Sequence, residues 1–142
     1  MCKRPMTILL VDDDDVTAEG VRRGLRGMEP QPSVIHVADG RVALDRLRGD
    51  DGMPPLERPY LVLLDLKMPV LDGFEFMDEV RRDEALRDTV IFVLTTSDLE
   101  SDRKRAYRHS IAGYIEKANV GKGFGRLGSL LSTFREAVTL PE

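Results

Sequence analysis

The chain has 142 residues, of which 42% are apolar and 32% are charged. This length and apolar content suit one domain with its own hydrophobic core and are too small for two. The 21 basic and 25 acidic residues leave a net charge of -4. That balance excludes a nucleic-acid binder that works by bulk positive charge, so we expect no nucleic acid among the partners.

The composition also limits the chemistry. No stretch approaches the roughly 18 apolar residues of a membrane span, and the short apolar run after Lys3 and Arg4 does not make a signal peptide. Cys2 is the single cysteine, and His36 and His109 are the only histidines. We therefore expect no disulfide, no metal centre of cysteines or several histidines, and no membrane partner. The chemistry must come from carboxylates, hydroxyls and lysines.

Short apolar runs alternate with helical patterns along the whole chain. Residues 6–11 form a continuous apolar run that stops at four consecutive aspartates, residues 12–15. Such a run predicts a strand buried on both faces, as in a parallel sheet covered by helices. The other predicted strands are residues 33–37, 60–64, 90–94 and 113–115.

Five helices are predicted after these strands, four of them from apolar residues at helical spacing. The defining residues are Val16, Val21, Leu25 and Met28; Val42, Ala43 and Leu47; Phe74, Met77 and Val80; and Phe124, Leu127, Leu131, Phe134 and Val138. Pro30 and Pro32 close the first helix. The remaining helix, over 99–109, is polar, and Asp98 is its expected N-cap. Residues 49–59 hold two glycines and three prolines, which predicts a loop inside the domain.

Strands and helices that alternate in this way predict a doubly wound α/β fold with right-handed crossovers. Functional sites in such folds lie outside the carboxyl ends of the strands, where the strand order reverses. The predicted strands end at Asp12 and Asp13, at Asp65, at Thr95 and near Lys117. We therefore expect three carboxylates, one hydroxyl and one ammonium group to converge at one edge of the sheet.

This combination of side chains is suited to receiving a phosphoryl group. Crowded carboxylates repel one another and attract a hard divalent cation such as Mg²⁺. The cation and Lys117 would neutralise charge on the phosphoryl oxygens, and Thr95 would donate a hydrogen bond to one of them. The attacking carboxylate would become an aspartyl phosphate. Each residue alone has an ordinary structural explanation, and only their joint placement favours the functional one.

Four segments in order resemble a bacterial response-regulator receiver domain over essentially the whole chain. They are 8–14 (ILLVDDD), 63–69 (LLDLKMP) with 71–73 (LDG), 93–96 (VLTT) and 113–117 (GYIEK). The resemblance implies a CheY-like, flavodoxin-like fold, with a five-stranded parallel sheet in the order 2-1-3-4-5. It also implies one receiver domain over residues 1–142, with a core of about 6–138 and no output domain.

The resemblance implies a role for each residue at the sheet edge. The matched positions are Asp65 for the phosphoacceptor; Asp12, Asp13, Asp65 and the backbone carbonyl of Lys67 for the Mg²⁺ ligands; and Thr95, Lys117 and Tyr114 for the switch hydroxyl, the phosphoryl-pairing lysine and the switch aromatic. A sensor histidine kinase or a phosphotransfer protein would supply the phosphoryl group. The surface of the fourth helix, fifth strand and fifth helix would then signal to a partner protein or to a second copy in a homodimer.

One position differs from the usual receiver sequence, and two segments resemble a smaller group within the family. Receivers usually have proline after the conserved lysine, but Ala118 stands here. A cis bond before a non-proline residue is unfavourable by about 2.5–4 kcal/mol, so we expect this bond to be either strained or trans. A trans bond is expected to move Lys117 slightly and to alter phosphoryl retention, and a lysine that fails to reach Asp65 would support this. Residues 49–59 and 95–97 resemble stand-alone regulators of bacteriophytochrome kinases, which implies a bacterial, cytoplasmic protein.

Two other interpretations stay open. Residues 13–17 (DDDVT) contain the D-x-D-x-T motif of haloacid-dehalogenase-type phosphatases, which would use Asp13 and Asp15. That family needs a further acidic pair after the lysine, and only Glu136 and Glu142 remain there. A receiver that acts only as a phosphorylation-independent scaffold is the second alternative, and the presence of every expected reactive residue disfavours it.

Overall fold

The computed structural model describes residues 5–142, so Cys2, Lys3 and Arg4 lie outside the described residues. Five parallel strands form one sheet in the order β2-β1-β3-β4-β5, which confirms the predicted topology. The strands are β1 (Thr7–Val11), β2 (Ser33–Val37), β3 (Tyr60–Leu64), β4 (Ile91–Thr95) and β5 (Gly113–Glu116). The helices are α1 (Asp15–Gly24), α2 (Gly40–Arg48), α3 (Gly73–Arg82), α4 (Glu100–Tyr107) and α5 (Gly125–Ala137).

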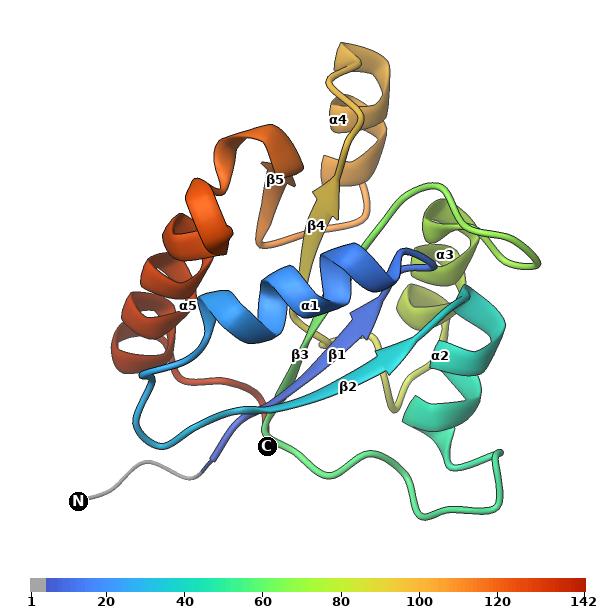
Figure 1. Ribbon diagram of the computed structural model, residues 1–142. Helices are drawn as coiled ribbons and strands as arrows, with labels where there is room; N and C mark the ends of the chain where they lie inside the picture. Colours follow the sequence, from blue (N-terminus) through green and yellow to red (C-terminus); the bar gives the residue numbers. More distant parts are fainter. Residues whose placement is uncertain (1–4) are drawn as a thin grey trace.

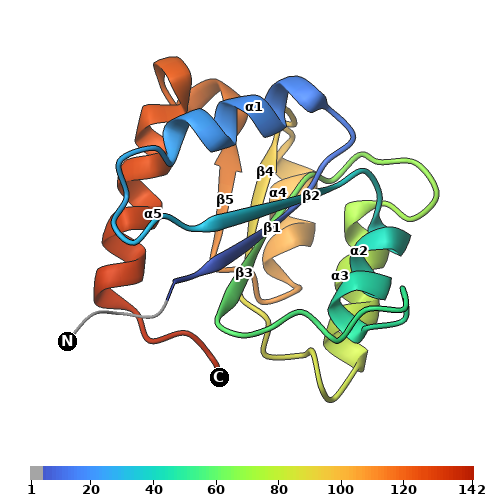
Figure 2. The ribbon, with the colours of Figure 1, turned by 60° about the horizontal axis from the view of Figure 1, so that its bottom comes forward.

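The helices cover both faces of the sheet. Figure 1 and Figure 2 show α1 and α5 on one face and α2, α3 and α4 on the other. Along β1, Ile8 and Leu10 belong to the core under α1 and α5, whereas Leu9 and Val11 belong to the core on the opposite face. None of these four side chains is more than 1% exposed, which explains the continuous apolar run. Because all strands are parallel, their carboxyl ends share one edge.

The long connection between α2 and β3 is a loop, as predicted. Residues 49–59 form neither a helix nor a strand. The loop starts at Gly49, whose φ of 80° ends α2 in the left-handed region that favours glycine. Within residues 5–142, no helix has the length and apolar character that crossing a membrane requires.

Some apolar residues that define the predicted helices are exposed or lie outside the helices in the structure. Val16 and Val42 are 75% and 46% exposed, because each lies in the first turn of its helix on the solvent side. Val138 lies beyond α5 and is 39% exposed. Leu25 and Met28 are buried, but α1 ends before both of them. The spacing therefore predicts that a helix is present. It does not predict where the helix begins or ends, or which of its terminal residues are buried.

The predicted N-cap of α4 is wrong. The helix begins at Glu100, Leu99 occupies the N-cap position, and no side chain caps it. Ser97 organises this end instead: its Oγ accepts the N–H of Leu99 at 3.3 Å and donates to Asp102 Oδ2 at 2.6 Å. A hydroxyl can donate and accept at the same time, whereas the Asp98 carboxylate could only accept.

α1 and α5 approach each other through glycines. A Cβ atom built on Gly128 would lie 1.9 Å from the carbonyl oxygen of Gly24, which no side chain tolerates. A Cβ atom on Gly20 would lie 2.6 Å from the Phe124 ring. Phe124, in the segment between β5 and α5, packs against this crossing.

We expect Gly128→Ala to lower the free energy of unfolding by about 1–3 kcal/mol, because the added methyl group overpacks the crossing. Gly125→Ala is the matched control in the same helix: its backbone is helical, with a φ of -59°, and an added Cβ meets nothing within 4 Å. That variant should be neutral or stabilised by up to about 1 kcal/mol. Urea unfolding measures both, and equal losses would contradict the close crossing.

Candidate functional site

The structure brings the predicted acidic residues together at the carboxyl edge of the sheet. Asp12 and Asp13 follow β1, and Asp65 follows the neighbouring strand β3. One carboxylate oxygen from each residue lies within 4.8 Å of the other two. Asp12 is fully buried and Asp65 is 8% exposed, whereas Asp13 is exposed at the rim. Three carboxylates therefore form one group that is open on one side.

Lys117 supplies the positive charge of this group. Its Nζ donates to Asp12 Oδ2 at 2.8 Å and lies 3.7 Å from Asp65 Oδ2. In residues 5–142 the cis peptide bonds are Glu29–Pro30 and Arg58–Pro59, so the bond from Lys117 to Ala118 is trans. The displacement expected from a trans bond is not seen, because Lys117 reaches both carboxylates. A short 3₁₀ turn, Lys117–Asn119, accommodates the chain there without proline.

Hydrogen bonds orient the two buried carboxylates. Asp12 Oδ1 accepts the N–H of Asp14 at 2.9 Å, which leaves Oδ2 for Lys117. Asp65 Oδ1 accepts the N–H of Leu66 at 2.8 Å, and Oδ2 lies on the side of the lysine. Each carboxylate thus keeps one oxygen directed at the shared space.

Burial raises the pKa of the Asp12 carboxyl above its ordinary value of 3.8. The hydrogen bond from Lys117, the N–H of Asp14 and the charge of Lys117 lower this pKa in part, and the negative charge of Asp65 raises it further. The lysine therefore offsets only part of the cost of a buried carboxylate. The remaining cost is what a bound cation would relieve.

The other two predicted site residues, Thr95 and Tyr114, meet at Ser97. Thr95 ends β4, is 1% exposed, and its Oγ1 accepts the N–H of Ser97 at 3.3 Å. Tyr114 lies on β5, and its hydroxyl donates to the carbonyl oxygen of Ser97 at 2.9 Å. Burial is the main cause that raises the pKa of this phenol. Through its hydroxyl Ser97 also binds Asp102 of α4, so one residue links both side chains to a helix.

The rest of the aspartate run has a structural role. Asp14 is the N-cap of α1 and accepts the N–H of Val16 at 2.9 Å. The Asp15 side chain is fully exposed, at 100%. Asp13 groups with Asp12 and Asp65, and Asp15 does not belong to that group. Lys67, whose backbone carbonyl was an expected ligand, lies in the exposed loop two residues after Asp65.

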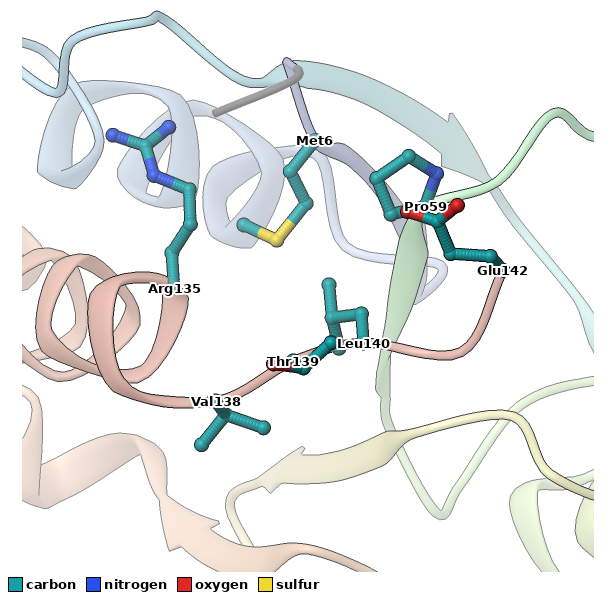
Figure 3. A pocket seen from close by; sticks show the side chains of 7 residues that line it. All are labelled: Met6, Pro59, Arg135, Val138, Thr139, Leu140 and Glu142. Carbon is teal, nitrogen blue, oxygen red and sulfur yellow. The ribbon is translucent and has the colours of Figure 1, made fainter. Parts of the chain in front are cut away.

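A separate hollow lies at the opposite edge of the sheet. Figure 3 shows its lining, which comes from the residues just before β1 and β3, from α5 and from the C-terminal segment. Its volume is about 250 Å³. Arg135 borders it, and its guanidinium donates to the backbone carbonyls of Glu29 and Pro30. This hollow is at the amino ends of the strands, so it takes no part in the chemistry of the acidic group.

The sheet order and the acidic group at its carboxyl edge define a class of α/β proteins, the receivers. The family model of the response regulator receiver domain matches residues 8–122. The chain belongs to this family, and an acidic cluster of this kind is typical of it. The resemblance predicted from the four sequence segments is confirmed.

The relatives agree with this assignment over nearly the full length of the chain. Response regulator Rcp1 of Synechocystis sp. is 32% identical over 138 residues, covering 96% of this chain and 94% of Rcp1. The crystal structure of Mn²⁺-bound Rcp1 matches with a TM-score of 0.84 and covers 97% of this chain and 100% of that chain. The phosphorylated cyanobacterial phytochrome response regulator RcpA matches with a TM-score of 0.89 at 30% identity, over 98% and 100%.

A third solved structure extends the comparison to bacteriophytochromes. The bacteriophytochrome response regulator RtBRR matches with a TM-score of 0.75 at 29% identity, covering 98% of this chain and 82% of that chain. The chain is therefore similar to stand-alone phytochrome response regulators, as residues 49–59 and 95–97 indicated.

Two contacts of the site were missed by the sequence reasoning. The ring of His36 on β2 lies 2.6 Å from the backbone oxygen of Asp12, and Ser97 links Thr95 to Tyr114. The position of His36 in the strand beside Asp12 was a weak signal for the first contact, because that contact depends on the register of the two strands. Nothing in the sequence signalled that Ser97, two residues after the end of β4, connects Thr95 to Tyr114.

We expect Asp12→Asn to raise the melting temperature at neutral pH without metal, because it removes a buried charge. A raised pKa in the folded state means that the native protein binds more protons than the unfolded chain above pH 3.8. Stability contributed by Asp12 therefore falls as the pH rises through that window. The gain from Asp12→Asn should shrink by several degrees as the pH falls toward 4.

Thermal unfolding from about pH 4 to 7, the range above the ordinary Asp pKa, measures this difference. Asp15→Asn is the matched control, because its side chain is fully exposed at 100%. It should show little dependence on pH. A gain for Asp12→Asn that is the same at every pH would contradict the role of burial.

Proposed function

We propose that this response regulator receives a phosphoryl group on Asp65 from the phosphohistidine of a sensor kinase. The observation that carries the proposal is the shared pocket of Asp65, Asp12 and Asp13, with Lys117 Nζ 3.7 Å from Asp65 Oδ2. A carboxylate beside an ammonium group can attack phosphorus while the developing charge is neutralised. As expected from the sequence, no histidine base is needed, because the ionised carboxylate is already deprotonated.

The donor set fits a divalent cation, for which we propose Mg²⁺. Its ligands would be Asp12, Asp13, Asp65 and the backbone carbonyl of Lys67, all oxygen donors of the kind that Mg²⁺ prefers. A bound cation supplies charge neutralisation for the phosphoryl oxygens. The burial that raises the pKa of Asp12 supports this assignment, because Lys117 offsets only part of the cost of that buried carboxylate. Rcp1, the relative whose structure holds Mn²⁺, supports it as well.

We propose Oδ2 of Asp65 as the attacking atom, the oxygen that forms the bond to phosphorus. Two contacts support this choice: Oδ1 accepts the N–H of Leu66, and Oδ2 lies 3.7 Å from Lys117 Nζ. The phosphorus–nitrogen bond to the donor histidine breaks, and the imidazole of the kinase leaves with that electron pair. Lys117 then pairs with an oxygen of the new phosphoryl group, and the hydroxyl of Thr95 donates to another.

The output follows from the contacts of Ser97. A move of Thr95 toward the new anion changes its bond to the Ser97 N–H, and Ser97 also holds the hydroxyl of Tyr114 and the Asp102 carboxylate of α4. The Tyr114 ring packs against the core on this face. We propose that α4, β5 and α5 form the surface that then signals to a partner protein or to a second copy of the chain.

The kinase is the remaining component. RcpA and RtBRR are named as regulators of phytochromes, and a bacteriophytochrome histidine kinase in the cytoplasm is the partner that we propose for this chain. A phosphotransfer protein would supply the same phosphohistidine chemistry. Residues 1–142 would act as a single receiver domain that passes the signal to another protein.

We expect the native protein to gain one phosphoryl group from acetyl phosphate or a phosphorylated kinase when Mg²⁺ is present. The gain should be lost with EDTA, because the metal neutralises the phosphoryl oxygens, and it should be lost in Asp65→Asn, which has no nucleophile. Asp15→Asn, at the exposed start of α1, is the matched control and should be phosphorylated like the native protein. Intact mass spectrometry measures each outcome.

Phosphorylation of Asp65→Asn to the native extent would refute the assignment of Asp65. Sustained hydrolysis of p-nitrophenyl phosphate that depends on Asp13 would instead favour the phosphatase interpretation. A native protein that accepts no phosphoryl group from any donor and still binds its partner would favour the scaffold interpretation.

A further inference from the structure

A histidine of β2 binds the backbone beside the acidic group. The Nε2 atom of His36 lies 2.6 Å from the carbonyl oxygen of Asp12, and the His36 side chain is 17% exposed. A carbonyl oxygen only accepts, so Nε2 carries the hydrogen and donates it. This contact joins the residue before the last one of β2 to the first residue after β1, although the two residues are 24 positions apart.

Both backbone polar groups of Asp12, its N–H and its carbonyl, therefore form hydrogen bonds with β2. The regular pairing of β1 with β2 ends at Val11 and Val37, and the N–H of Asp12 donates to the carbonyl of Val37 at 3.0 Å. The carbonyl of Asp12 lies beyond this ladder, where β2 offers no further backbone N–H in the register. The His36 ring supplies the donor that the strand does not.

The carbonyl of Asp12 belongs to the peptide unit that leads to Asp13. That unit is planar, so fixing its oxygen also fixes the N and Cα atoms of Asp13. Asp13 is exposed, yet its carboxylate lies within 4.8 Å of those of Asp12 and Asp65. Packing does not hold an exposed side chain in place, so its direction depends on the backbone that carries it.

We propose that His36 is a positioning residue for the metal site, and that its N–H keeps Asp13 aimed at the shared pocket. This inference rests on the metal site of the proposed function. An imidazole suits the task, because it can donate this hydrogen bond without the permanent positive charge that a lysine or arginine donor would place beside the site of the cation. The other ring atom, Nδ1, faces the exposed Asp15 carboxylate at 4.0 Å, so it does not contact the acidic group.

The experiment compares three variants of His36 in the unphosphorylated full chain. Glutamine carries its amide nitrogen about where Nε2 lies, asparagine carries it about where Nδ1 lies, and leucine has no donor. We expect His36→Leu and His36→Asn to weaken Mg²⁺ binding roughly 10-fold, the lower end of the effect of a residue that orients a metal ligand. His36→Gln should stay within about 3-fold of the native affinity, because it restores the donor.

Isothermal titration with MgCl₂ measures the affinity, and metal-free thermal unfolding measures stability separately. His109→Leu is the matched control: His109 is the other histidine, and it contacts Asp78 at 2.7 Å and the Arg105 carbonyl at 3.0 Å. That variant should lose stability and keep the native Mg²⁺ affinity. A purely structural role for His36 would give the same pattern at both positions.

The outcomes separate this inference from the proposed function. If the native protein binds no Mg²⁺, the proposed metal site is wrong and the inference is overturned with it. If the native protein binds Mg²⁺ and His36→Leu binds it equally well, only the role of His36 is overturned. Should His36→Leu not fold, a long-range ¹H–¹⁵N spectrum of the native protein decides: an Nε2–H tautomer of His36 supports the inference, and an Nδ1–H tautomer overturns it.

Discussion

The ion pair between Lys117 and Asp12 is the interaction on which the site depends. The two residues are 105 positions apart, and the lysine reaches a carboxylate with no exposed surface. Asp12 follows β1 and Lys117 follows β5, so the two side chains meet only when β1, β3, β4 and β5 pair in this order. The fold thus concentrates negative charge at one edge and supplies one ammonium group from the far side of the sheet. Burial raises the pKa of Asp12, and Lys117 lowers it only in part, so the lysine offsets part of the cost of this buried carboxylate.

The same edge is joined to α4 by polar contacts. α4 buries a single alanine, so apolar packing holds it weakly. Its C-terminal end is tied to α3, because Arg81 donates to the carbonyls of His109 at 2.7 Å and Ser110 at 3.2 Å. Its N-terminal end is held by the bond from Ser97 to Asp102. Under the proposed function, a displacement at the end of β4 would reach α4 through this bond at its N-terminal end.

Much of this could be predicted because the signals are local. Continuous apolar runs predicted the strands, and the rule that parallel strands share their carboxyl edge predicted that Asp12, Asp65 and Lys117 lie together. The errors have a common cause. Val16 and Val42 follow the helical spacing and are exposed, and Asp98 has the right chemistry for a cap and leaves α4 uncapped. In each case the residue type fits a helix. The sequence pattern does not say where the helix begins or how that end lies relative to the core.

The sequence by itself determined the alternation of strands and helices and the acidic residues at the strand ends, because these are fixed by positions next to one another in the chain. The strand order followed from the family resemblance that its four motifs carry. Only the tertiary structure decided which oxygen of Asp65 stays available, that Lys117 reaches it through a trans bond, and that His36 and Ser97 hold the surrounding backbone. The reason is geometric. These contacts depend on strand register and side-chain direction between segments far apart in sequence, and a shift of one residue in either strand would abolish them.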